Sequence, residues 1–130
     1  MELAQVRLLV GDFRDCYRFY RDVLGLRPQF EAEDGPYAKF TPDGGGAGVA
    51  LQDRAQMARV LERLAAEPAG HRSLVVLRVD DLDGYCAEVA ARGGVLVSGP
   101  APMTDRMRVA HLADPAGNVV ELQEWLALRE

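Results

Sequence analysis

Residues 114–122 of this chain read Asp-Pro-Ala-Gly-Asn-Val-Val-Glu-Leu, a turn that runs directly into an apolar segment. Proline presets its own φ, and glycine and asparagine tolerate positive φ, so the first five residues are typical of a tight turn. Such a turn returns the chain antiparallel to the strand before it. The stretch therefore predicts a hairpin whose second strand ends the fold.

A strand and a helix precede this hairpin. Residues 74–79 form an apolar run that predicts a strand, and Asp80-Asp81 can cap a helix. The helix ends before Gly93-Gly94. Its apolar stripe consists of Leu82, Tyr85, Cys86 and Val89. The second half of the chain thus begins with a strand and a helix and ends with strands.

The first half has the same order. Val6, Leu8 and Val10 alternate with other residues and predict a strand over 3–10 with these three side chains facing the core. Gly11-Asp12 can end that strand and cap a helix over 12–24, which stops at Gly25. Short strands are predicted at about 27–31, 37–41 and 47–52, separated by Gly- and Pro-rich turns. Met57, Val60, Leu61 and Leu64 predict an amphipathic connector helix at about 54–68.

The two halves are related by constant offsets, which indicates an internal duplication. Phe13, Tyr20 and Gly25 correspond to Leu82, Val89 and Gly94, each pair differing by 69 residues. Residues 49–53 correspond to 120–124 at an offset of 71. Similar-looking strand-helix units could arise without duplication, but here the caps, apolar stripes and closing glycines all agree. We therefore predict an α+β fold of two tandem βαβββ modules, at about 1–53 and 69–130, forming a single domain over residues 1–130.

Composition limits the classes of function. The 130 residues carry a formal charge of -5 and are 48% hydrophobic, as expected for one globular domain without a nucleic-acid groove. No apolar run reaches the length of a membrane span, and residues 1–4 lack signal-peptide features, so a cytoplasmic protein without membrane partners is expected. Cys16 and Cys86 fall inside the helix patterns and are expected to be small buried apolar residues.

The motifs resemble those of the vicinal-oxygen-chelate superfamily, which includes glyoxalases, bleomycin-resistance proteins and extradiol dioxygenases. Residues 10–13, Phe19-Tyr20 and residues 24–26 are similar to the opening pattern of that family, and residues 114–122 to its closing pattern, with Ala116 replacing an aspartate. The resemblance implies a glyoxalase/bleomycin-resistance-like fold, in which the paired modules form a cupped mixed sheet around a ligand cavity.

The resemblance also implies where metal ligands would lie. The four ligand positions of metal-dependent members fall on Gln5, Ala50, Leu74 and Glu121, although a register shift of one residue would select Leu51 instead of Ala50. Alanine and leucine offer no lone pair to a metal. Gln5 and Glu121 are therefore expected to be remnants of a metal site, no cofactor is predicted, and a divalent metal is not favoured.

Other residues are candidates for the ligand pocket. His111, three residues before Asp114, is expected on the inward face, where it could pair with Glu121 as an acid-base pair or serve as a hydrogen-bonded wall residue. Arg7 and Arg78 share the alternation phase of Gln5 and Leu74, so each could bind an anionic ligand or pair with an acidic residue. Trp125 could line the cavity or a dimer interface.

Three classes of function remain open. The first is a small-molecule binding protein of the bleomycin-resistance type with a degenerate metal site and its ligand in the cup of the sheet. The second is a lyase, isomerase or dioxygenase that uses a noncanonical metal or the Glu121/His111 pair. The third is an accessory module that serves only assembly. A homodimer is expected, because modules of this kind expose sheet edges and apolar faces that a second copy can cover.

Overall fold

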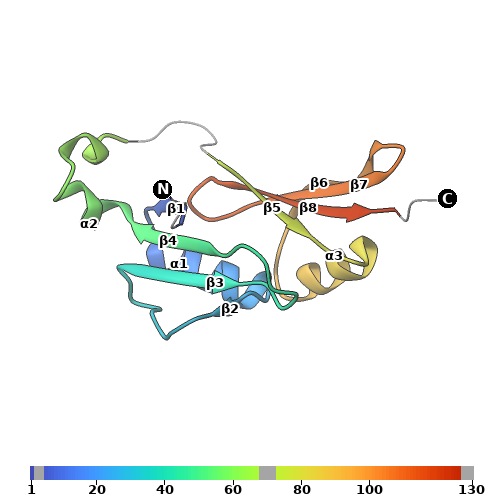
Figure 1. Cartoon of the computed structure of the whole chain (residues 1–130), viewed down its shortest axis with the longest axis horizontal. Coiled ribbons are helices and arrows are strands. Elements are labelled where there is room, and N and C mark those ends of the chain that lie inside the picture. Colours follow the sequence, from blue (N-terminus) through green and yellow to red (C-terminus); the bar gives the residue numbers. More distant parts are fainter. Residues whose placement is uncertain (2–4, 68–72, 127–130) are drawn as a thin grey trace. The chain divides into compact units, whose positions relative to one another are not determined.

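The computed structural model describes residue 1, residues 5–67 and residues 73–126. The chain divides into two compact units, Met1–Ala69 and Gly70–Glu130 (Figure 1). Each unit contains a four-stranded mixed sheet, with strand orders β1-β4-β3-β2 and β5-β8-β7-β6. The predicted α+β class and the two tandem modules are confirmed. The start of the strand predicted at 3–10, the end of the predicted connector and the start of the second predicted module lie outside the described residues.

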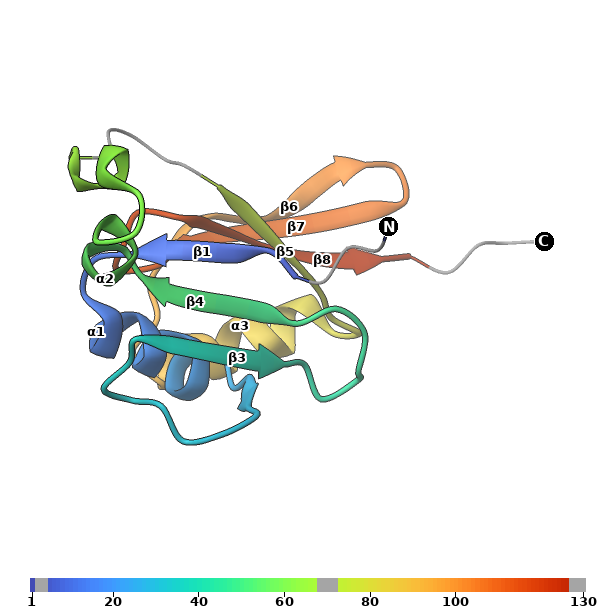
Figure 2. The ribbon, with the colours of Figure 1, turned by 60° about the vertical axis from the view of Figure 1, so that its left-hand side comes forward.

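The first unit contains one strand and a helical segment before its remaining strands. Its elements are β1 (Arg7–Val10), α1 (Phe13–Arg18), the π-helical turn η1 (Phe19–Val23), β2 (Arg27–Pro28), β3 (Tyr37–Thr41), β4 (Val49–Asp53), α2 (Arg54–Ala58) and the 3-10 turn η2 (Glu62–Ala65). β1 pairs parallel with β4, and β3 pairs antiparallel with β4, so the three strands lie side by side in Figure 2.

The second unit repeats this order. Its elements are β5 (Leu74–Arg78), α3 (Leu82–Ala91), β6 (Leu96–Thr104), β7 (Met107–Ala113) and β8 (Val119–Trp125). β5 pairs parallel with β8, β8 antiparallel with β7, and β7 antiparallel with β6. In both units the first strand therefore lies at an edge of the sheet beside the last strand.

The strand registers obey the offsets read from the sequence. In the first unit Arg7 pairs with Ala50, and in the second Val76 pairs with Glu121, which are the same positions displaced by 69 and 71 residues. On the other side of the last strand, Lys39 pairs with Ala50 and His111 with Glu121. Positions in the two units can therefore be compared pair by pair.

The core of each unit lies between its sheet and its longest helical segment. In the first unit Tyr17 and Tyr20 are fully buried, and their rings lie 5.1 and 6.0 Å from that of Phe40 on β3. In the second unit Leu122 of β8 and Leu82 of α3 are fully buried. Successive side chains of a strand alternate between the two faces of the sheet. Every second side chain therefore lies on the face away from the helix and is not part of this core.

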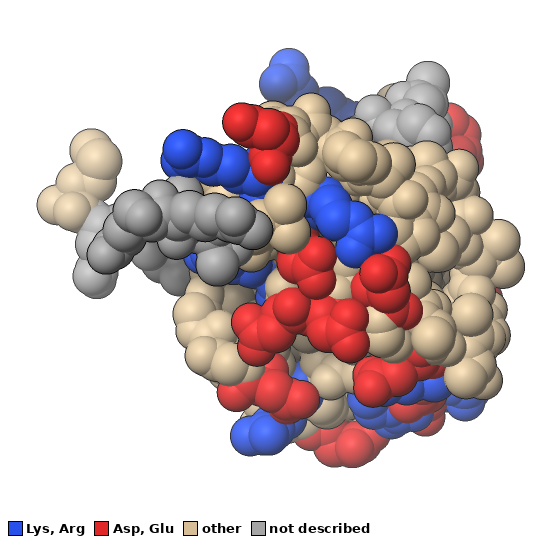
Figure 3. Space-filling view, turned by 90° about the vertical axis from the view of Figure 1, so that its right-hand side faces the viewer, with Lys and Arg blue, Asp and Glu red and all other residues tan. Residues whose placement is uncertain are grey.

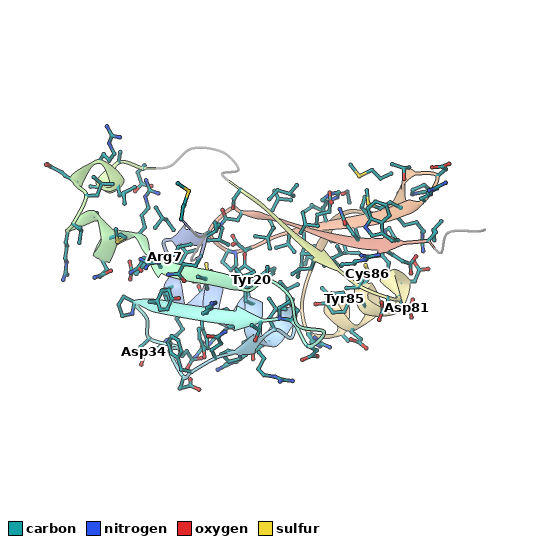
Figure 4. The ribbon with its side chains drawn as sticks, in the orientation of Figure 1. Arg7, Tyr20, Asp34, Asp81, Tyr85 and Cys86 are labelled. Carbon is teal, nitrogen blue, oxygen red and sulfur yellow. The ribbon has the colours of Figure 1, made fainter. Side chains whose placement is uncertain are left out.

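α1 and α3 both begin after an aspartate, but of these two aspartates only Asp81 caps its helix with its side chain. Asp81 accepts a hydrogen bond from Gly84 N at 3.1 Å, and Figure 4 shows it at the start of α3, which also carries Tyr85 and Cys86. Asp12 is the N-cap residue of α1, as predicted, but its side chain forms no capping hydrogen bond. The helix predicted over 12–24 also continues as a π-helical turn, in which Leu24 N bonds to Phe19 O.

Three other details differ from the sequence prediction. The connector is not one amphipathic helix but two short turns, α2 and η2, separated by an extended Leu61. Val60 and Leu61 are 75% and 48% exposed, so these two apolar side chains are not buried against other described residues. Val6 is 65% exposed because β1 begins only at Arg7. The strand predicted at 27–31 is limited to β2.

The turn at 114–118 is held by one buried carboxylate. Asp114 accepts hydrogen bonds from Ala116 N (2.9 Å), Asn118 N (2.8 Å) and Asn118 Nδ2 (3.0 Å). Asn118 in turn accepts from Ser73 Oγ at 2.7 Å, which ties the turn to the start of β5. Gly117 has a φ of 89°, where a side chain would be strained.

We expect Asp114→Ala to destabilise the protein by about 3 kcal/mol, because it leaves buried N–H groups without an acceptor. Chemical denaturation measures the difference. Asp105→Ala, which changes an exposed aspartate in the β6–β7 turn, is the matched control and is expected to change stability by less than about 0.5 kcal/mol. Equal effects of the two substitutions would contradict the structural role of the turn.

Cys16 and Cys86 are both buried, as predicted, and burial raises the pKa of the Cys86 thiol. Arg108 bonds to Asp83 at 2.9 Å and lowers the pKa of that carboxyl. Figure 3 shows Asp and Glu side chains gathered on the drawn face, with Lys and Arg beside them. No described helix is both long and apolar enough to cross a membrane.

Candidate functional site

One face of the second sheet carries a continuous set of polar side chains. α3 packs against the opposite face, where Val120 and Leu122 are fully buried. Register and alternation place the following residues together on the face away from α3, here called the second-sheet face: Leu74, Val76, Arg78, Ser98, His111, Glu121, Gln123 and Trp125. Five of the eight sequence-predicted site residues belong to this set.

A chain of hydrogen bonds crosses this face from β6 to β8. Ser98 Oγ lies 2.8 Å from His111 Nδ1, and His111 Nε2 lies 2.9 Å from Glu121 Oε1. The other carboxylate oxygen of Glu121 accepts from Gln123 Nε2 at 2.8 Å. Gln123 Oε1 in turn accepts from Trp125 Nε1 at 3.1 Å. The arrangement therefore links a hydroxyl, an imidazole and a carboxylate in series.

Two irregularities in β6 direct Ser98 onto this face. Leu96 pairs with Leu112 and Ser98 with His111, so β6 uses one residue more than β7 over that interval. The same excess recurs between Ser98 and Ala101. Each extra residue reverses the alternation of the strand, and without the first one Ser98 would share the helix-facing phase of Leu96. The two bulges thus explain why a serine stands opposite His111.

Gly99 allows the second bulge. It has a φ of 80°, and a Cβ built on it would lie 2.5 Å from Val109 O and 2.9 Å from Ala110 Cα. The sequence analysis did not identify Ser98 or Gln123 as site residues. The sequence feature that could have indicated Ser98 is the adjacent Gly99-Pro100 pair, because glycine and proline inside a strand often mark a bulge or a close approach of another backbone segment.

Apolar groups and one cation complete the second-sheet face. Leu74, Val76 and Trp125 are 55%, 48% and 48% exposed, whereas Glu121 is 5% exposed. The guanidinium carbon of Arg78 lies 5.8 Å from the centroid of the Trp125 ring. This face therefore offers a flat aromatic surface, a positive charge and exposed aliphatic side chains beside a buried carboxylate.

The first sheet has a comparable face. Arg7, labelled in Figure 4, lies with its guanidinium 5.3 Å from the centroid of the Tyr37 ring and donates to Gln52 Oε1 at 3.2 Å. With the Gln5 amide oriented to donate to Tyr37 Oη at 2.6 Å, its oxygen accepts from Arg7 Nε and Nη2 at 2.9 and 3.0 Å. The ring of Tyr37 also stacks on Phe30 at 6.0 Å. All of these partners of Arg7 are neutral.

The structure bears on the alternatives left open for the two arginines. Three acidic residues that could pair with an arginine have other contacts. Asp53 caps α2, Glu121 pairs with His111, and Glu124 pairs with Arg108. Within the described part of the chain, neither Arg7 nor Arg78 forms an ion pair. Each arginine instead lies beside an aromatic ring, Tyr37 or Trp125.

The four family ligand positions do not provide a complete set of donors. Ala50 pairs with Arg7 and corresponds to Glu121, whereas Leu51 is fully buried in the helix-facing phase, so the register favours Ala50. Ala50 and Leu74 have no donor atom, and both oxygens of Glu121 already have hydrogen-bond partners. Among the described residues, no cluster of three or more His, Cys, Asp and Glu side chains is suited to a metal ion. The residues present do not fit the metal that the family implies.

The sequence matches a family of known proteins over nearly its whole length. The model of the Glyoxalase/Bleomycin resistance protein/Dioxygenase superfamily matches residues 2–122. The uncharacterized protein YraH of Bacillus subtilis (strain 168) is 32% identical over 130 residues, covering 97% of this chain and 100% of the relative.

Solved structures with the same fold include two informative neighbours. A glyoxalase/bleomycin resistance protein/dioxygenase from Nocardioides has a TM-score of 0.78 at 24% identity, covering 100% of this chain and 87% of that one. TnmS3, an antibiotic binding protein from Streptomyces sp. CB03234, has a TM-score of 0.72 at 25% identity, covering 96% of both chains.

Proposed function

Because this chain belongs to the Glyoxalase/Bleomycin resistance protein/Dioxygenase superfamily, we propose that it is a metal-independent binding protein for small organic molecules. The observation that carries this proposal is the donor set at the four ligand positions. Ala50 and Leu74 lack a coordinating atom, and the carboxylate of Glu121 is engaged by His111 and Gln123. A ligand would then be bound by side-chain contacts instead of by coordination to a metal.

The two sheet faces suggest the chemistry of that ligand. Each face pairs an arginine with an aromatic ring, Arg7 with Tyr37 and Arg78 with Trp125, and neither arginine has an acidic partner among the described residues. An aromatic surface binds flat rings, and an unneutralised guanidinium attracts anionic or carbonyl oxygens. We therefore propose a ligand with fused or conjugated rings bearing oxygen acceptors. TnmS3, which is similar in fold and length, is described as an antibiotic binding protein.

Fluorescence of Trp125 tests this proposal directly, because it is the only tryptophan in the chain. We expect saturable quenching by at least one member of a panel of aromatic antibiotics that includes bleomycin. Arg78→Ala is expected to weaken that binding roughly tenfold, in line with a lost contact to a desolvated cation. Arg92→Ala, at the C-cap of α3 where Arg92 pairs with Glu88, is the matched control and should leave the affinity unchanged.

The absence of saturable quenching across the panel would contradict the proposal. So would equal effects of the Arg78 and Arg92 substitutions, since binding would then not involve the second-sheet face.

A second candidate function is a metal-free enzyme that uses Glu121 and His111 as an acid-base pair. The contact of 2.9 Å between their side chains favours it, because proton transfer requires such a distance. A lyase or isomerase of this kind would convert its ligand during the titration. Mass spectrometry of the ligand after incubation distinguishes this candidate from binding alone.

We also propose that the protein is a homodimer. Val95, Val97 and Met103 in and beside β6 are 76%, 64% and 59% exposed, and exposed apolar side chains of this kind are typical of surfaces that a partner covers. Sedimentation velocity at micromolar concentration is expected to give twice the chain mass of 14.2 kDa. A concentration-independent mass of one chain would contradict this expectation.

A further inference from the structure

The hydrogen-bond chain of Ser98, His111 and Glu121 has the order of a nucleophile, a base and a group that orients the base. The imidazole of His111 stands between the other two, with its ring nitrogens 2.8 Å from Ser98 Oγ and 2.9 Å from Glu121 Oε1. Both distances fall within the range required for proton transfer from a hydroxyl to a positioned base.

The carboxylate determines which nitrogen of His111 carries the proton. An ionised carboxylate can only accept hydrogen bonds, so Nε2 donates to Glu121 and Nδ1 retains its lone pair toward Ser98. The hydroxyl of Ser98 then donates to Nδ1. Gln123 holds the other oxygen of Glu121 at 2.8 Å and thereby fixes the carboxylate.

Solvent exposure decreases along the hydrogen-bond chain from Ser98 to Glu121, which is the order that catalysis requires. Ser98 is exposed, the His111 side chain is 25% exposed, and the Glu121 side chain is 7% exposed. A substrate can therefore reach the hydroxyl, while the carboxylate is shielded from water, which strengthens its interaction with the imidazole. The two bulges of β6 hold Ser98 in place, since neither a regular strand nor a residue larger than Gly99 would present it in this position.

We propose that Ser98 is a nucleophile activated by His111, with Glu121 as its positioning residue, and that the second unit hydrolyses activated carboxylic esters. Ser98 Oγ bonds to the ester carbonyl carbon while its proton passes to His111 Nδ1. The bond to the leaving alcohol then breaks, and the alkoxide takes that proton. Water, deprotonated by the same nitrogen, attacks the acyl-serine, releasing the carboxylic acid and restoring the hydroxyl. This activity does not depend on the ligand-binding function proposed above.

Covalent labelling with an alkyl fluorophosphonate tests the nucleophile. Ser98 Oγ displaces fluoride from phosphorus, and the proton leaves as HF through the base, so each reacted chain gains one phosphonyl group. The sequence has only two serines, Ser73 and Ser98. Ser73 is an internal control, because its hydroxyl bonds to the amide oxygen of Asn118 and not to an imidazole. Peptide mapping is expected to place the adduct on Ser98 alone.

Four variants examine the roles of these residues. Ser98→Ala should abolish labelling and p-nitrophenyl acetate turnover, whereas Ser73→Ala should retain both. His111→Gln is expected to slow labelling on the order of 100-fold, the typical contribution of a general base. Glu121→Gln should slow labelling and also change the ¹⁵N chemical shifts of His111, because the protonated nitrogen is no longer fixed by a carboxylate. A loss of packing alone would not change that tautomer.

Labelling of Ser98 that is lost in Ser98→Ala and slowed in His111→Gln supports the proposal. An unlabelled wild-type protein under conditions that label a serine hydrolase overturns it. Equal labelling of wild type and His111→Gln would also overturn it, since the hydroxyl would then react without its base. Thermal melting of each variant confirms that the fold is retained.

Discussion

Leu74→Ala should leave the weak affinity of the protein for nickel or zinc unchanged, whereas Leu74→His should increase that affinity on the order of 100-fold over the parent. Leu74 is 55% exposed and lies on the second-sheet face, two residues along β5 from Val76, the partner of Glu121. Histidine at this position would add a third donor beside Glu121 and His111, and a bound ion would replace the hydrogen bond between those two side chains. Three nitrogen and oxygen ligands on one face suit a borderline divalent ion.

Isothermal titration of the parent and variants with nickel provides the measurement, and metal should raise the melting temperature of Leu74→His by mass action. Val95→His is the matched control, because Val95 is exposed directly before β6, a strand that is not adjacent to β8, which carries Glu121. Adding His111→Ala to Leu74→His should remove most of the gain. Tight binding of nickel by the unmodified protein would contradict the inference that the site lacks a metal-coordinating atom at position 74.

Gly99→Ala should destabilise the protein by about 3 kcal/mol or more. The residue has a φ of 80°, and a Cβ would lie 2.5 Å from Val109 O, a contact that only a shift of the backbone can relieve. The left-handed backbone itself costs a non-glycine residue about 1–2 kcal/mol, and the clash adds to this. The variant should also move Ser98 away from His111, because the bulge at Gly99 helps to hold Ser98 opposite His111.

Gly93→Ala is the matched control within the same unit. Gly93 has a φ of 91°, but nothing lies within 4 Å of a Cβ built on it. Its substitution therefore reports the backbone term alone, expected at about 1 kcal/mol. Denaturant unfolding of both variants separates the two terms. Equal destabilisation would show that the close approach of β6 to β7 does not restrict position 99.

The module order and strand register could be predicted because they follow from local signals. Helix stripes and closing glycines recur at fixed offsets, and the same offsets relate the pairing of Ala50 to that of Glu121. The placement of His111 opposite Glu121 follows from the same turn, because a tight hairpin sets the register of the strands that it joins.

The parts that could not be predicted depend on tertiary contacts. Val60 and Leu61 have helical spacing, yet a stripe stabilises a helix only where another surface covers it. Ser98 faces His111 only because two bulges reverse the alternation of β6. The period-2 pattern of the sequence does not show where a strand contains such an extra residue. The neutral partners of Arg7, Gln5 and Gln52, come from separate segments and carry no local pattern.

Metal independence of ligand binding is the central claim, and one titration tests it most directly. Quenching of Trp125 by an antibiotic that binds should be measured before and after exhaustive chelation with EDTA and dialysis. We expect the affinity to agree within about twofold, because the Arg78–Trp125 pair and the exposed aliphatic side chains of β5 need no ion. Binding that is lost on chelation and returns on addition of zinc or nickel would contradict the claim.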